Sequence, residues 1–140
     1  MPKFSILSNY RLSSCHIDLQ NLFNEVVKKY DCTITKGHRN QKDQNDAYNS
    51  GRSKLKWPDG NHNKIPSWAI DVYPYPIRLP LDTDSEIIKQ KKLRRFYHFA
   101  GYVLRTAHEM GFNIRWGGDW DGDYIFSDQT FDDLVHFERS

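Results

Sequence analysis

Apolar residues recur at helical spacing in two stretches of the chain. Residues 17–30 carry one apolar stripe after a candidate N-cap pair, Ser13-Ser14, and residues 84–110 carry a longer one. Gly111 follows the longer stripe, as is typical of a helix C-terminus, because glycine accepts the left-handed backbone conformation found there. Residues 41–50 lack an apolar stripe but follow an asparagine, so they predict a third, polar helix.

Four short segments have the residue pattern of β-strands. They are residues 32–35, 68–73, 113–116 and 134–138. An irregular loop over residues 52–66 precedes the second of these strands, and loops of this length in a small domain are often functional. Short strands between helices of unequal length favour an α+β fold over a regular β-α-β arrangement.

Length and composition predict one compact domain, residues 1–140, that is made inside a cell. Hydrophobic residues make up 38% and aromatic residues 14%, which is enough for a core and argues against a disordered chain. The net charge of +2 is too small for an obligate nucleic-acid binder, and no apolar run is long enough to span a membrane. Because the N-terminus lacks a signal-peptide stretch and two cysteines make no disulfide framework, we expect a reduced, soluble protein. We also expect it to be a monomer.

Two histidines stand apart from the four others by their positions. His62 lies in the irregular loop before a predicted strand, and His136 lies on the final strand beside carboxylates. With Asp71 on the second strand they form a His/Asp/His set, a type of donor set that catalytic zinc sites complete with a water molecule. The residue types alone leave a structural alternative open, in which Asp71 caps a turn and His136 packs at a sheet edge.

The residues around these candidates resemble a known family. The segment from His62 to Pro74 resembles the His-Asn-x-x-Pro-Ser-x-Ala-x-Asp zinc motif of peptidoglycan-cleaving zinc peptidases. Many members space the first histidine and the aspartate by seven residues around a glycine. This chain has a spacing of nine with Pro-Ser, as phage and prophage members do. Segments 36–52 and 116–138 are similar to the family's strand-Gly-x-Arg-helix segment and to its C-terminal signature.

The family includes D-alanyl-D-alanine carboxypeptidases and dipeptidases, and phage L-alanyl-D-glutamate endolysins. The resemblance implies a small antiparallel sheet flanked by helices, of the hedgehog and DD-peptidase type. It implies that His62, Asp71 and His136 bind Zn²⁺. It also implies that Asp133, rather than the adjacent Asp132, is the general base.

The resemblance assigns roles to further residues. Arg39 would face the developing oxyanion or a substrate carboxylate, since its guanidinium suits both. Glu138 shares a strand face with His136, so it either orients that ring or forms a plain salt bridge. The residues expected to shape the substrate cleft are Gln44, Tyr48 and Ser53.

The acidic run from Asp119 to Asp123 begins like a calcium-binding EF-hand loop. Such a loop requires glycine at its sixth position and a bidentate glutamate at its twelfth, where this chain has Tyr124 and Thr130. These departures favour a solvated acidic loop, and the sequence leaves calcium binding open. Trp116 and Trp120 are either core aromatics or walls that stack on the substrate, and we favour the core.

The expected function is that of a zinc hydrolase that cuts a peptide bond in the peptidoglycan stem peptide. We favour the L-alanyl-D-glutamate bond because the compact, signal-less chain resembles phage lysins, which stay in the host cytoplasm until lysis and then act on the cell wall. D-alanyl-D-alanine carboxypeptidase activity is the alternative within the family. Two alternatives come from other classes: a metal-dependent nuclease that uses His62, Asn63 and a basic loop, and a non-catalytic binding module that keeps zinc for structure.

Overall fold

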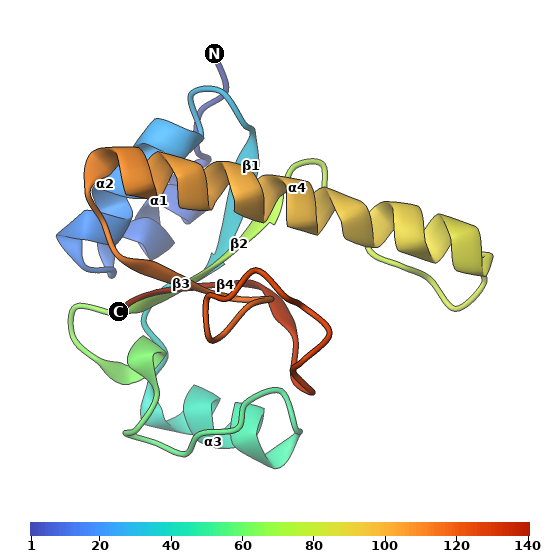
Figure 1. Ribbon diagram of the computed structural model, residues 1–140. Helices are drawn as coiled ribbons and strands as arrows, with labels where there is room; N and C mark the ends of the chain where they lie inside the picture. Colours follow the sequence, from blue (N-terminus) through green and yellow to red (C-terminus); the bar gives the residue numbers. More distant parts are fainter.

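The computed structural model describes all 140 residues, and Figure 1 shows α2 and α4 on one side of a small sheet, with α3 on the other. In chain order the elements are α1 (Ile6–Ser13), α2 (Ile17–Val26), β1 (Cys32–Lys36), α3 (Gln41–Asn49), the 3₁₀ turn η1 (Asn61–Asn63), β2 (Ala69–Pro74), α4 (Glu86–Met110), β3 (Ile114–Gly117) and β4 (Asp133–Arg139). The predicted α+β fold, with a small antiparallel sheet flanked by helices, is confirmed.

The sheet places distant parts of the chain next to one another. Its strand order is β1-β2-β4-β3, and each neighbouring pair is antiparallel. Strands β2 and β4 are therefore the two central strands, although more than fifty residues separate them in the chain. In their register Asp71 lies opposite His136, so two of the candidate ligands are direct cross-strand neighbours.

One face of β4 is fixed by an aromatic core. Phe137 is fully buried between Phe23 of α2 and Phe99 of α4, with ring centroids 5.6 and 6.1 Å away. Burying such a side chain stabilises the fold by roughly 2–3 kcal/mol. Because successive strand residues point to opposite faces, Phe137 turns His136 and Glu138 away from the helices, towards the opposite face of the sheet.

The N-terminal part of the chain differs from the prediction. The hydrophobic pattern does not predict helix α1, which begins after Ser5, whose side chain accepts a hydrogen bond from a first-turn N–H. The expected N-cap pair is wrong, because Ser14 is the C-cap of α1. Helix α2 begins instead after His16, whose Nδ1 accepts a hydrogen bond from the N–H of Asp18 at 3.0 Å.

The other helices begin and end close to their predicted positions. The side chain of Asn40 accepts a hydrogen bond from the N–H of Asp43 at 2.9 Å and caps α3. Helix α4 ends at Met110, and Gly111 follows it with a left-handed φ of 79°. No helix combines the length and the apolar character that a membrane crossing requires.

Candidate metal centre and cleft

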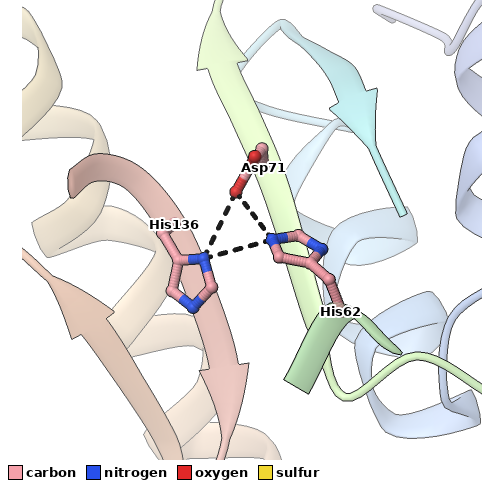
Figure 2. Close-up of side chains that lie close together, drawn as sticks. All are labelled: His62, Asp71 and His136. Atoms are coloured by element: carbon pink, nitrogen blue, oxygen red, sulfur yellow. Dashed lines mark hydrogen bonds and ion pairs between the residues drawn. The ribbon is translucent and has the colours of Figure 1, made fainter. Parts of the chain in front are cut away.

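Three side chains converge above the centre of the sheet (Figure 2). His62 comes from the turn η1, Asp71 from β2 and His136 from β4. His62 Nε2 lies 3.2 Å from both Asp71 Oδ1 and His136 Nδ1, and the last two atoms lie 3.3 Å apart. The three atoms form a nearly equilateral triangle, and each side chain is at most 15% exposed.

Each histidine ring has one nitrogen inside the triangle and one outside it. The hydrogen bond of the outer nitrogen determines whether the inner nitrogen carries a proton or a lone pair. His62 Nδ1 lies 2.7 Å from the carbonyl oxygen of Gly37, and His136 Nε2 lies 2.7 Å from Glu138 Oε1. Both partners are acceptors, so the outer nitrogens carry the protons. In the neutral rings, His62 Nε2 and His136 Nδ1 therefore present lone pairs towards Asp71 Oδ1. These three atoms are all acceptors, so the space between them attracts a cation.

The pKa values of Asp71 and His136 are shifted in opposite directions, each towards the charged form of the side chain. Burial opposes ionisation of Asp71, but His62 and His136 more than offset this effect and lower the pKa of Asp71. Burial also opposes protonation of His136, yet its hydrogen bonds to Asp71 and Glu138 raise the pKa of His136 to about 9. The group thus favours a positive charge at its centre, whether a proton or a metal ion supplies it.

The donor set and its dimensions fit a zinc ion. Ligands of a tetrahedral zinc ion, each about 2.0–2.1 Å from the metal, lie about 3.3 Å from one another. The three inner atoms are 3.2–3.3 Å apart. Their residues, His62, Asp71 and His136, therefore lie close enough together to hold one metal ion. Three protein ligands leave a fourth position for water, as in a catalytic rather than a structural zinc site.

Asp133 and Arg39 lie beside this triangle. Asp133 Oδ2 is 3.9 Å from His136 Nδ1, and Arg39 Nη2 is 3.8 Å from Asp71 Oδ2. Burial raises the pKa of Asp133, and the charge of Asp71 adds to the rise. Asp132 has different surroundings, since its carboxylate accepts a hydrogen bond from Gln129.

A cleft of about 300 Å³ opens next to the triangle. Gln44 and Ser53 line this cleft, as do Arg39 and Asp133, whereas Tyr48 is not among the lining residues. The amide of Gln44 is fully engaged by the protein: its oxygen accepts from Arg39 and Asn63, and its nitrogen donates to Ser53 and Leu55.

The structure also brings further residues to the cleft. The favoured core position of Trp120 is wrong, and the residue lies in the cleft wall instead: it is partly exposed, with its ring centroid 5.4 Å from that of His136. Trp116 is buried, as expected. Asn61, Arg115 and Phe131 line the cleft as well, and nothing in their local sequence marks them.

Comparison with known families identifies the group to which the chain is similar. The profile of the phage L-alanyl-D-glutamate peptidases matches residues 1–139. The chain belongs to this family. The resemblance drawn from the histidine and aspartate motifs is thereby confirmed, and the phage L-alanyl-D-glutamate peptidase family places the chain among the peptidoglycan hydrolases.

A solved structure shares the fold of this phage peptidase family member. The crystal structure of the Serratia marcescens L-Ala D-Glu endopeptidase ChiX superposes with a TM-score of 0.70 over 99% of this chain and 91% of the other. The two sequences are 20% identical, so this likeness concerns the fold. A comparison with curated proteins found no match.

In this member of the phage peptidase family, Glu138 combines the two roles that the sequence left open. Its Oε1 accepts the hydrogen bond from His136 Nε2, while Oε2 accepts bonds from Arg115 Nη2 at 2.6 Å and Asn61 Nδ2 at 2.7 Å. Burial opposes ionisation of Glu138, but His136 and Arg115 lower its pKa to about 2. An ionised Glu138 holds the His136 ring in the orientation that directs Nδ1 at the other two candidate ligands.

Proposed function

We propose that this chain is a zinc-dependent L-alanyl-D-glutamate endopeptidase that cuts the stem peptide of peptidoglycan. The observation that carries the proposal is the triangle of inner atoms from His62, Asp71 and His136, which has the donor types and spacing of a three-ligand zinc site. The family description supports the choice of bond.

In this proposal each residue of the cleft has a defined task. Zinc, when bound by the three ligands, lowers the pKa of a water molecule and polarises the scissile carbonyl. Asp133 accepts the proton of the attacking water at its carboxylate, and its raised pKa suits it to return that proton to the leaving amine. Arg39 stabilises the negative charge that develops on the carbonyl oxygen.

The remaining cleft residues favour an acidic substrate. Arg39, Arg52, Lys54 and Arg115 all line the cleft. The carboxylates of a stem peptide would meet these cations, of which Arg39 and Arg115 also form ion pairs with Asp71 and Glu138. We place the reaction at the cell wall during host lysis, as for a phage lysin.

Mass spectrometry of purified peptidoglycan digested by the protein tests this proposal. We expect new free amino termini on D-glutamate, which a chelator abolishes and added zinc restores. His62→Ala should remove both zinc and cleavage, while His108→Ala, which changes an exposed histidine of α4, should retain both.

Other products would overturn the proposal in distinguishable ways. Release of a terminal D-alanine would assign the chain to the carboxypeptidase branch. Zinc binding without any cleavage would indicate a binding module in which the metal is structural.

A further inference from the structure

The first turns of α4 and the segment before this helix form an arm that projects from the molecule. Figure 1 shows the N-terminal part of α4, in yellow, extending beyond the sheet with this segment beside it. No residue from Tyr75 to Arg95 is buried, and the buried residues of α4 all lie at Phe96 or beyond. Residues 75–95, which we call the arm, therefore contribute nothing to the core.

Two basic side chains of α4 hold the arm together. Lys92 Nζ donates hydrogen bonds to the carbonyl oxygen of Leu79 at 3.2 Å and to Asp84 Oδ2 at 2.6 Å. Arg95 Nη1 donates a hydrogen bond to the carbonyl oxygen of Pro76 at 2.6 Å. The segment before α4 is thus tied to the side of the helix. Such an arm loses less conformational entropy on binding a partner than a free loop does.

The arm exposes large apolar side chains that no other part of the molecule covers. Before α4 they occupy every second position from residue 75 to residue 81, and within α4 they lie in the first turn. These exposed residues are Tyr75, Ile77, Leu79, Leu81, Ile87 and Ile88. Single exposed apolar residues are ordinary, whereas a group of them on one projecting element is typical of an interaction surface.

The arm also concentrates positive charge. Its six basic and three acidic residues give residues 75–95 a net charge of +3, whereas the whole chain has +2. Among these basic residues only Lys92 forms an ion pair, with Asp84. Arg78, Lys89, Lys91, Arg94 and Arg95 take part in none of the ion pairs of the structure. The arm therefore combines exposed apolar groups with cations that lack a counter-charge.

We propose that the arm binds the surface of an anionic phospholipid bilayer. The apolar side chains would enter the boundary between headgroups and acyl chains, while the cations contact the headgroup phosphates. The arm would lie on the bilayer and not cross it, since no helix has the length and apolar character for a crossing. None of the arm residues lines the cleft, so this proposal does not depend on the proposed peptidase function.

Other occupants match only one of the two properties of the arm. A nucleic acid or an anionic wall polymer supplies phosphates for the cations, but it does not take up a group of aliphatic side chains. A second copy of the chain could cover the apolar side chains, but two arms that each carry a charge of +3 would repel one another. An anionic bilayer satisfies both, because its acyl chains lie directly below its phosphates.

Flotation of the zinc-loaded, full-length protein with lipid vesicles tests this proposal. One set of vesicles contains phosphatidylglycerol and phosphatidylcholine in equal parts, and the other contains phosphatidylcholine alone. At about 0.1 M NaCl we expect binding to the anionic vesicles to be at least tenfold tighter, and about 1 M NaCl should weaken it because salt screens the charges. This comparison uses the unaltered protein, so it holds even if a variant does not fold.

Two variants of the arm separate the contributions of charge and apolar area. Lys89→Gln/Lys91→Gln/Arg94→Gln should bind the anionic vesicles about 100-fold more weakly, because it removes three cations from the surface contact. Ile87→Ser/Ile88→Ser should bind at least about tenfold more weakly, because it removes apolar side chains that enter the bilayer. Both variants should keep the wild-type melting temperature, since none of these side chains is buried.

Lys3→Gln/Lys29→Gln/Lys42→Gln is the matched control for the charge variant. It removes the same charge from exposed positions outside the arm and should float like the wild type. Equal loss of binding in this control would overturn the proposal, because net charge and not the arm would then cause binding.

Three further results would contradict the proposal. The first is a wild-type protein that does not float with the anionic vesicles at about 0.1 M NaCl. The second is unchanged binding of Ile87→Ser/Ile88→Ser, which would indicate a phosphate-bearing polymer recognised by charge alone. The third is a wild-type dimer in analytical ultracentrifugation that this isoleucine variant dissociates, which would assign the arm to a second copy of the chain.

Discussion

Asp133 and Asp132 are adjacent in the chain, but their carboxylates have different partners. Asp133 lies beside His136 at the candidate metal site, while Asp132 accepts a hydrogen bond from Gln129. If Asp133 is the general base, Asp133→Asn should lower kcat by about 10²- to 10⁴-fold, because the amide cannot accept the proton of water. Its zinc content should stay at one per chain, as measured by elemental analysis alongside steady-state kinetics on peptidoglycan fragments.

Asp132→Asn is the matched control for this prediction. It makes the same chemical change one residue away and should retain most of the activity. A larger loss of rate in Asp132→Asn than in Asp133→Asn would show that the general base is assigned to the wrong carboxylate.

Gln44 is a buried amide that connects Arg39 to the loop over residues 52–66. It is 1% exposed, and its four hydrogen bonds reach Arg39, Asn63, Ser53 and Leu55. Gln44→Ala leaves several of these groups buried without partners, so we expect the free energy of unfolding to fall by about 2 kcal/mol. Urea unfolding of this variant and of Asn45→Ala, an exposed neighbour on α3, checks the prediction.

The outcome separates two roles of Gln44. Loss of stability together with a lower kcat would indicate that Gln44 positions Arg39. Unchanged stability with a raised KM would instead indicate the direct substrate contact that the sequence suggested.

For single residues, the sequence identifies a functional side chain when the residues next to it in the chain form a recognisable motif. His62 and Asp71 fall within one short motif, and His136 lies in another, so the sequence alone is enough to propose them as ligands. Arg115 and Asn61 reach the cleft only through the packing of β3 and η1, which no local motif encodes. Trp120 lies within the C-terminal signature, but its local sequence does not distinguish a cleft tryptophan from a core tryptophan.

Among the elements, α4 and its C-terminal cap each contain one glycine, and the two should respond in opposite directions to the same substitution. Gly111 follows the helix with φ of 79°, whereas Gly101 is exposed within it, and an added Cβ meets no atom within 4 Å at either position. Gly111→Ala should destabilise the protein by about 1 kcal/mol, since alanine is strained in the left-handed conformation. Gly101→Ala should stabilise it by about 0.5–1 kcal/mol, because alanine is the better helix former.

Thermal and urea unfolding of the two single variants measure this contrast. Since neither methyl group touches another residue, the difference reports backbone conformation alone. Equal effects of the two substitutions would contradict the assigned end of α4.

The predicted elements are most accurate where a cap or an apolar stripe marks their ends. Asn40 and Gly111 define the start of α3 and the end of α4. Helix α1 escapes prediction because it has eight residues and only Ser8 and Leu12 are buried, which leaves no clear apolar stripe. The end of α1 at Ser14 then resembles a helix start, because serine is common at both kinds of position.

For the whole molecule, the proposed metal centre depends on complete folding. Its candidate ligands come from η1, β2 and β4, and α4 separates the last two elements in the chain. An unfolded chain does not hold the three side chains together, so we expect metal binding and folding to be coupled. The centre should therefore contribute to the stability of the entire fold and not only to its chemistry.

Removal of zinc should lower the melting temperature by about 10 °C. A ligand at 1,000 times its dissociation constant stabilises the folded state by about 4 kcal/mol, and each kcal/mol corresponds to roughly 2–4 °C in a domain of about this size. His62→Ala should melt at the same temperature with and without zinc, whereas His108→Ala should keep the full zinc-dependent shift. Differential scanning calorimetry of the zinc-loaded and zinc-free proteins measures this shift. A wild-type melting temperature that does not change with zinc would mean that protons, and not the metal, balance the three converging acceptors.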